Sequence, residues 1–216
     1  MLRRVMSTED TRERLLNKAM EIFSAQGYVG ASTRDICRAA EVGNAAIHYH
    51  FGDKAAIYRE LFKRLLDNFE QRLRSTGMQA LQGRTALAAY YRELMRPLVE
   101  DDSLAQQVYL HIREEFQPSA IVDDLKPRAL KLQFELLGGL LQRELAISDL
   151  DAAAQRLVLA LHGIALIYVI QHRSIGAMLP QLMDGPNWLG RTTEQLADLG
   201  WAMIESERAK RVEAGH

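Results

Sequence analysis

The sequence predicts an all-α protein with a small N-terminal domain and a larger C-terminal helical domain. Apolar residues recur at helical spacing along nearly the whole chain. No alternating run is long enough for a sheet, and neither an internal repeat nor a low-complexity segment is present. Ser75-Thr76-Gly77 has the turn-forming composition expected between domains. We therefore expect one domain over residues 9–76 and a second over residues 77–216.

The charges are unevenly distributed between these two domains. The whole chain carries a net charge of −1, which does not by itself indicate a nucleic-acid binder. Residues 1–76 contain 13 Lys/Arg and 10 Asp/Glu, whereas residues 77–216 contain 14 and 18. The N-terminal domain is therefore the basic one, as expected if DNA affinity resides there.

Nothing in the sequence indicates export or membrane insertion. Residues 1–9 lack the apolar segment of a signal peptide. The longest apolar run, residues 157–170, is interrupted by His162 and is too short to span a bilayer. The single cysteine excludes a disulfide framework within one chain and fits a reducing compartment. We expect a soluble cytoplasmic protein with no membrane partner.

Two long helices frame the N-terminal domain. The first is expected over residues 10–26, with Asp10 or Thr11 as its N-cap and its end at Gly27. The other is expected to begin after Asp53, a suitable N-cap, and to continue to about residue 74. Both carry an apolar stripe at helical spacing, so each is predicted to pack on a small core.

Between these helices, residues 32–51 have the pattern of two short helices joined by a tight turn. The hydroxyl of Thr33 is the predicted cap of the first short helix. Gly43 is expected to permit the sharp reversal of the chain. The second short helix begins with small residues and then carries a His-Tyr-His run. This is the layout of a helix-turn-helix, whose second helix enters the DNA major groove with its N-terminal end.

With this motif, residues 9–69 resemble the DNA-binding domain of the TetR family of transcriptional regulators. The resemblance is carried by residues 23–28, 31–36 and 47–58, the last with a Tyr-His-Phe run followed three residues later by a lysine. It implies a C-terminal ligand-binding and dimerisation domain, and a homodimer that binds palindromic double-stranded operator DNA. Residues 113–119 resemble the CecR-like subgroup of the family.

The resemblance also implies particular DNA contacts, which we expect because the residues form an ordered run rather than a random helix surface. The implied phosphate contacts are Thr33, Tyr49, His50 and Lys54. The implied base-facing residues are Asn44, Ala45 and His48. The remaining candidate DNA-binding residues are Arg34 and Gly43. Asn can pair bidentately with adenine, and a lysine at a helix start shares a phosphate with free backbone amides.

The C-terminal domain is predicted to be helical throughout. Its expected helices cover residues 85–99, 103–116, 127–145, 151–172 and 193–210, with residues 178–183 as a further candidate for a short helix. The helix over 151–172 is apolar on more than one face, which predicts burial on all sides. We expect it to form, with the last helix, a two-fold interface with a second chain, as in the family the N-terminal half resembles.

We also expect the C-terminal domain to bind a small, largely apolar effector. The candidate ligand-binding residues are Tyr109, His111, Arg113, Phe116, Phe134, Leu137, His162, Ala165 and Tyr168. Core packing explains most of the apolar members equally well, and the polar members are the better candidates because unpaired burial would be costly. Gly138-Gly139 lies inside a predicted helix, which a close helix contact or a bend beside a cavity would explain.

No catalytic, metal or cofactor pattern is recognisable. His111, His162 and His172 show no ligand pair such as H-E-x-x-H, and no phosphate-binding loop or nucleophile motif is present. We therefore expect a ligand-responsive DNA-binding regulator without a cofactor, and the family's habit favours repression. A DNA-binding protein without a ligand and a helical enzyme are the alternative interpretations.

Overall fold

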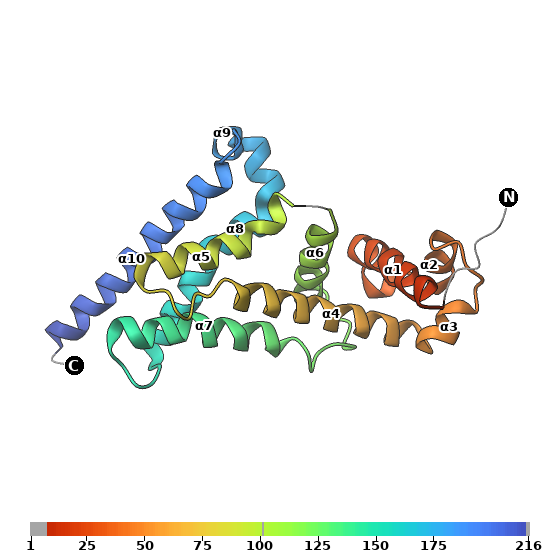
Figure 1. The fold of residues 1–216 in the computed structure, drawn as a ribbon, viewed down its shortest axis with the longest axis horizontal. Helices are drawn as coiled ribbons and strands as arrows, with labels where there is room; N and C mark the ends of the chain where they lie inside the picture. Colours follow the sequence, from red (N-terminus) through yellow and green to blue (C-terminus); the bar gives the residue numbers. More distant parts are fainter. Residues whose placement is uncertain (1–7, 101, 215–216) are drawn as a thin grey trace. The chain divides into compact units, whose positions relative to one another are not determined.

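A computed structural model describes residues 8–100 and 102–214 as helices joined by turns, with no strand in these ranges (Figure 1). Residues 1–7, which make up most of the segment examined for a signal peptide, lie outside the described ranges. The first four helices are α1 (Thr8–Gly30), α2 (Thr33–Ala39), α3 (Ala46–Phe51) and α4 (Lys54–Ser75). The later elements are α5 (Gly83–Met95), η1 (Arg96–Leu98), α6 (Asp102–Phe116), α7 (Pro127–Leu145), α8 (Ala152–Met178), α9 (Pro180–Met183) and α10 (Trp188–Glu213).

The all-α prediction is confirmed, and the boundaries differ at identifiable residues. Helix α7 begins and ends where the sequence predicts. Helix α1 is assigned through Gly30, but Gly27 has φ 72° and interrupts the regular helix where its end is predicted. Helix α8 continues to Met178 across a kink at Gln171, so it is longer than the predicted 151–172. Asp151 caps α8 by accepting a hydrogen bond from the amide of Ala154 at 2.9 Å.

The chain divides into two compact units that are not continuous in sequence. Unit 1 comprises Met1–Asp67 with Asp101–Pro127, and unit 2 comprises Asn68–Glu100 with Arg128–His216. Helix α6 belongs to unit 1 because it packs along α1. The two compact units therefore have other boundaries than the two domains predicted from the sequence, which meet between residues 76 and 77. The division into a DNA-binding and a ligand-binding domain stays a prediction. Helix α4 does end at Ser75, next to Gly77 with φ 66°.

Unit 1 has a small core of aliphatic and aromatic side chains. Its fully buried members include Leu15, Ala19, Phe23, Ile36, Ile47, Ile57, Tyr58 and Phe62. The rings of Phe23 and Tyr58 meet edge to face with centroids 4.8 Å apart, which joins α1 to α4. Burying one such ring contributes on the order of 1.5–3 kcal/mol, so this core holds the short helices α2 and α3 in place.

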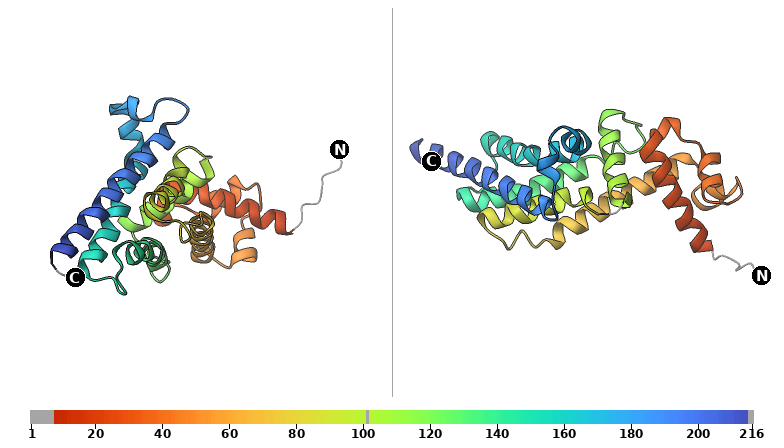
Figure 2. Two further views of the ribbon diagram at one scale, coloured as in Figure 1. Left: turned by 60° about the vertical axis from the view of Figure 1, so that its left-hand side comes forward. Right: turned by 90° about the horizontal axis from the view of Figure 1, so that it is seen from above.

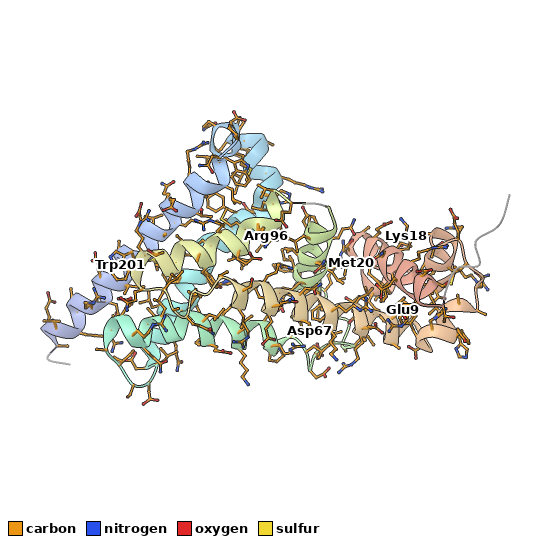
Figure 3. All side chains as sticks on the ribbon, in the orientation of Figure 1. Glu9, Lys18, Met20, Asp67, Arg96 and Trp201 are labelled. Atoms are coloured by element: carbon orange, nitrogen blue, oxygen red, sulfur yellow. The ribbon has the colours of Figure 1, made fainter. Side chains whose placement is uncertain are left out.

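Unit 2 is built around the close packing of α5, α8 and α10 (Figure 2). A Cβ atom added to Gly200 of α10 would lie 2.8 Å from the Tyr91 hydroxyl and 3.1 Å from Leu161. A larger residue at this position would force these side chains to shift, so glycine suits the close packing of the helices. Trp201, on the next position of α10, packs beside Gly83 at the start of α5 (Figure 3). Gly138 of α7 is buried beneath the side chain of Leu150, a loop residue before α8, so the close contact at this glycine is with a loop and not with another helix.

Helix α8 passes the length and composition test for crossing a membrane, which corrects the expectation that its apolar run is too short. The helix has 27 residues, and its most apolar 18-residue window has a mean hydropathy of 1.7. Weakly polar residues such as alanine and glycine extend the run beyond 157–170. One such helix is weak evidence for a membrane, since core and interface helices have the same composition.

Candidate nucleic-acid interface

Ser32, rather than the predicted Thr33, caps helix α2. The Ser32 Oγ atom accepts a hydrogen bond from the amide of Asp35 at 3.1 Å, and the backbone of Ser32 is extended (φ −120°, ψ 147°). Thr33 is the first residue of the helix itself. A cap must have non-helical backbone angles while its side chain reaches the amide three residues on, and Ser32 meets both conditions. The hydroxyl of half-buried Thr33 is therefore not used as the cap.

The turn between α2 and α3 reverses at Glu41 and not at Gly43. Glu41 has φ 54°, the left-handed conformation, whereas Gly43 has no such angle. Arg14 of α1 donates hydrogen bonds to the carbonyl oxygens of Ala40 and Glu41, so a cation satisfies the free carbonyls at the end of α2. A Cβ atom on Gly43 would meet nothing within 4 Å, so the turn does not require glycine there.

Helix α3 and the turn before it expose the predicted base-facing set, while one apolar residue of the helix points inward. Ile47 is buried at 2% exposure, which anchors the helix to the unit 1 core. Asn44, Ala45 and His48 are exposed, and Tyr49 is 78% exposed. These side chains are free to meet a groove of DNA, while their contacts with DNA stay a prediction.

The ring of His48 is oriented by a hydrogen bond at the end of its own helix. Its Nδ1 atom lies 2.6 Å from the carbonyl oxygen of Gly52. Because a carbonyl oxygen only accepts, Nδ1 donates in this hydrogen bond and Nε2 is left on the other side of the ring.

The candidate phosphate contacts lie at two helix starts and on α3. Thr33 is half-buried and Arg34 exposed in the first turn of α2. On α3, the half-buried ring of His50 meets the Tyr49 ring edge to face, with centroids 4.9 Å apart. The positions on α2 and on α3 are both compatible with a phosphate backbone that passes the start of α2 and the side of α3.

Lys54 stands at the start of α4 above an aromatic ring. Asp53 caps this helix as predicted, since its Oδ1 atom accepts from the amide of Ala56 at 2.7 Å. The Lys54 ammonium lies 4.5 Å from the centre of the Tyr28 ring and 3.5 Å from the carbonyl oxygen of Val29. The ring and the carbonyl orient the lysine, and the ammonium has further protons for an anion.

Cys37, on the inner side of α2, is fully buried. Its Sγ atom lies 3.8 Å from the carbonyl oxygen of Asn44, where the thiol donates a weak hydrogen bond across the turn. No group of three or more possible metal ligands occurs among the residues that the structure describes.

The predicted effector residues fall into both compact units. Those in unit 1 are Tyr109, His111, Arg113 and Phe116, and those in unit 2 are Phe134, Leu137, His162, Ala165 and Tyr168. Phe116 is 73% exposed, and Arg113 donates to the carbonyl oxygen of Ala25 at 3.1 Å, so neither side chain is enclosed with the others. Leu137 and Ala165 are buried core residues of unit 2.

Two histidines of this set have defined surroundings. Burial lowers the pKa of His111, which packs on the Phe62 ring with centroids 5.8 Å apart and is therefore neutral near pH 7. In unit 2, the buried Tyr90 hydroxyl lies 2.8 Å from Nδ1 of His162. Sequence reasoning missed Arg14, because an arginine on an amphipathic helix gives no pattern that singles it out.

Comparison with known families decides the identity of this arrangement. Residues 15–61 match the bacterial regulatory proteins of the tetR family, and residues 84–203 match the C-terminal domain of the HTH-type transcriptional dual regulator CecR. The second match alone spans more than half of the chain. The chain belongs to the TetR family. Its C-terminal domain is of the CecR type, and it is a DNA-binding transcriptional regulator.

Curated relatives match over only a short part of the chain. The regulator HbdR from Aromatoleum sp. (strain CIB) is 35% identical over 65 residues, which cover 30% of this chain and 28% of HbdR. AcrR from Shigella flexneri is 36% identical over 55 residues, or 26% of each protein. The matched part thus spans little more than a quarter of either relative.

Solved structures extend the TetR likeness to nearly the whole fold. A chain from Pseudomonas aeruginosa PAO1, described as a transcriptional regulator, superimposes with a TM-score of 0.67 at 18% identity, covering 96% of this chain and 94% of that one. FadR from Bacillus subtilis in complex with stearoyl-CoA gives a TM-score of 0.62 at 18% identity, over 88% of this chain and 98% of FadR. SmeT in complex with triclosan gives 0.63 at 20% identity, over 89% and 90%. At these identities the likeness concerns the fold alone.

Proposed function

We propose that this TetR-family member is a cytoplasmic, ligand-responsive repressor that binds a palindromic operator as a homodimer. The observation that carries the proposal is the exposed surface formed by Asn44 in the turn before α3, Ala45 at the N-cap and His48 on the helix, followed by Lys54 at a capped helix start. Base edges would be read by α3, and phosphates would be held by Lys54 with Thr33, Arg34, Tyr49 and His50.

Repression is the proposed sign of regulation. IcaR of Staphylococcus aureus, which is 30% identical over 56 residues, is named as a negative transcriptional regulator. A protein that occupies an operator needs no further activity to block transcription. The C-terminal domain is of the type found in CecR, which is described as a dual regulator. A transcription assay therefore has activation at some operators as its second outcome.

The homodimer is proposed from the uncovered apolar residues of α8 and α10. Leu159, Ile167 and Ile170 of α8 are 51%, 45% and 39% exposed, and Leu199 of α10 is 52% exposed. Isolated exposed apolar residues are ordinary, but a set of them on the two neighbouring helices that the sequence predicts as an interface favours a second copy as the cover.

A small effector is proposed to bind in the C-terminal half of the chain. Among the described residues, the buried Oε1 atom of Gln107 and the buried Nδ1 atom of His111 have no hydrogen-bond partner. They lie one turn apart on α6, and leaving both unpaired costs on the order of 1–3 kcal/mol each. A largely apolar ligand with a hydroxyl or amide group would satisfy them. The acyl chain of stearoyl-CoA in the FadR structure and triclosan in the SmeT structure make a largely apolar ligand reasonable for this fold.

The experiment that tests the proposed DNA contact compares two lysine variants of the full chain. Duplexes selected by the protein from a random library, and a mixed-sequence duplex, are titrated over a range of salt concentrations. Lys54→Ala should weaken binding to every duplex and lower the salt slope by about 0.9, the loss of one phosphate contact. The control, Lys131→Ala, removes the same charge from an exposed position of unit 2 and should leave both unchanged.

Two outcomes would contradict the proposal. Failure of the unchanged protein to select any duplex would remove the DNA-binding function. An unchanged slope for Lys54→Ala would remove Lys54 from the interface and leave α3 to be tested separately.

A further inference from the structure

Residues 113–119, whose sequence resembles the CecR-like subgroup, have a structural role that the proposed function does not use. The segment ends α6 and begins the loop that leads to α7. Although it lies in the C-terminal half of the sequence, it belongs to unit 1, together with the helix-turn-helix. Its contacts with α1 and α4 are therefore contacts with the DNA-binding helices.

Glu114 is a buried carboxylate that gathers hydrogen-bond donors from three parts of unit 1. It is 1% exposed. Its Oε2 atom accepts from the Tyr58 hydroxyl of α4 at 2.6 Å. Its Oε1 atom accepts from the amide and the hydroxyl of Ser119, at 2.7 and 2.9 Å, and Lys126 lies 3.6 Å from it. With both oxygens engaged, the carboxylate holds Tyr58 and the loop in one arrangement.

Tyr58 carries this arrangement to the start of α4. Its ring packs on Tyr28 with centroids 5.0 Å apart, and the Lys54 ammonium lies 4.5 Å from the centre of the Tyr28 ring. Lys54 is also one helical turn before Tyr58 on α4. A continuous series of contacts thus runs from the Glu114 carboxylate through two aromatic rings to the lysine.

Arg113, the neighbour of Glu114, binds the end of α1 directly before Tyr28. It donates to the carbonyl oxygen of Ala25 at 3.1 Å, near the end of α1. Its Cδ atom would lie 3.1 Å from a Cβ atom on Gly27, whose φ of 72° turns the chain directly before Tyr28. Arg113 therefore packs against the turn that sets the direction of the Tyr28 side chain.

We propose that Arg113 and Glu114 are positioning residues for DNA binding, which place Lys54 for its phosphate contact through Tyr58 and Tyr28. The inference rests on the proposed function of Lys54. In this proposal, the 113–119 segment acts on the start of α4, where Lys54 binds phosphate. A segment from the C-terminal half then decides how firmly the N-terminal domain can hold DNA.

A purely stabilising role for Glu114 would produce a different pattern of mutational effects. Loss of stability would lower the fraction of competent protein and weaken DNA binding whether or not Lys54 is present. Loss of positioning would weaken binding only while Lys54 is there to be positioned. A double-mutant cycle with Lys54→Ala separates the two roles.

The test uses Tyr58→Phe, which removes one hydroxyl and keeps the ring, in the full-length chain. DNA affinity and its salt slope are measured on the selected duplex and on the mixed-sequence duplex, with and without Lys54→Ala. Two further variants are carried through the same cycle. Glu114→Gln replaces one of the two carboxylate oxygens, and Arg113→Met removes the donor to the Ala25 carbonyl. Tyr91→Phe is the matched control, because it deletes a buried tyrosine hydroxyl in unit 2 that donates to Leu161 at 2.9 Å. Thermal melting identifies any variant that does not fold.

We expect Tyr58→Phe to weaken binding by about 2- to 30-fold and to lower the salt slope toward that of Lys54→Ala. In the Lys54→Ala background its further effect should be less than about twofold. Tyr91→Phe should change neither quantity.

Equal weakening by Tyr58→Phe in both backgrounds, or an unchanged salt slope, would overturn the positioning role while leaving Lys54 as a phosphate contact. Lack of any effect of Lys54→Ala would instead contradict the proposed function itself, and the inference with it. Since Tyr58→Phe makes the smallest change of the series, the result stands even if Glu114→Gln fails to fold.

Discussion

Ser32 and Asp35 bind each other twice at the start of α2: the Ser32 hydroxyl accepts from the Asp35 amide at 3.1 Å and donates to its carboxylate at 2.5 Å. The side chain of Asp35 also pairs with Arg38 one turn later. These contacts fix the first turn of a helix of only seven residues, which is too short to be stable alone.

Replacing Ser32 by alanine should therefore loosen the helix-turn-helix. The loss of the cap should lower the opening free energy of the α2 amides by about 0.5–2 kcal/mol. Native-state hydrogen exchange measures this directly. Thr33→Ala is the matched control, since Thr33 is not the cap and its replacement should have a smaller effect. A larger loss for Thr33 than for Ser32 would argue against the cap seen here.

Asn44 should carry sequence preference more than general affinity. If its amide pairs with an adenine, Asn44→Ala should cost about 1–3 kcal/mol on the preferred operator and little on a mixed-sequence duplex. Competition titrations with the two duplexes give the ratio. Asn68→Ala, at an exposed position of α4 in unit 2, serves as the control. Equal losses on both duplexes would show that Asn44 does not read a base.

The proposed interface predicts that charge on α8 dissociates the dimer. Ile170→Glu places a carboxylate among exposed apolar residues of α8 and α10, so analytical ultracentrifugation should find monomers with operator binding lost. Leu130→Glu on α7, where leucine is 49% exposed, makes the same change outside that set and should leave the dimer intact. An unmodified protein that is monomeric at micromolar concentration would contradict the two-fold interface.

Effector response should change when the two unpaired polar side chains of α6 are removed. Gln107→Leu and His111→Phe should alter the response of operator binding to a panel of largely apolar compounds that carry a hydroxyl or amide group. Operator affinity without compound should stay nearly unchanged. The coupling to be lost is worth about 1–3 kcal/mol. Leu130→Ala is the control, and a panel to which the unmodified protein gives no response would favour a regulator without ligand.

Acid should weaken the start of α8 through Asp151. A hydrogen bond from Arg211, assisted by the Ala154 amide, holds the pKa of Asp151 at about 2, below its ordinary value. Folding therefore favours the ionised carboxylate, whose stabilising effect is complete above pH of about 4 and is lost as the pH falls toward 2. Asp151→Asn keeps a capping oxygen but cannot titrate. The stability difference between the two proteins, from urea unfolding at several pH values, should shrink across that range; a constant difference would contradict the coupling.

The helices were predictable because each carries its own apolar period and end signals. Asp53 caps the helix for which the sequence proposes it, and Pro127 begins α7 at a position that tolerates proline. The exposure of the residues on α3 also agrees with the helix-turn-helix pattern, although their contacts with DNA are still predictions.

What the sequence could not predict depends on tertiary contacts. Gly43 was the natural choice for the tight turn, yet Glu41 adopts the left-handed conformation because Arg14 binds the carbonyl oxygens around it. Helix α6 comes after the predicted domain boundary in the sequence, yet it packs on the N-terminal helices. Its hydrogen-bond partners are Ala25 on α1 and Tyr58 on α4, which are both distant in the sequence. No local period reports such a pairing.

The buried thiol of Cys37 makes the helix-turn-helix a natural chemical reporter. It is the only cysteine of the chain, and its side chain is fully buried in the DNA-binding unit. A thiol reagent can react with it only when α2 opens, so the labelling rate measures that opening without an introduced probe. Labelling with and without DNA or a candidate effector would show whether each of them closes or loosens this part of the protein.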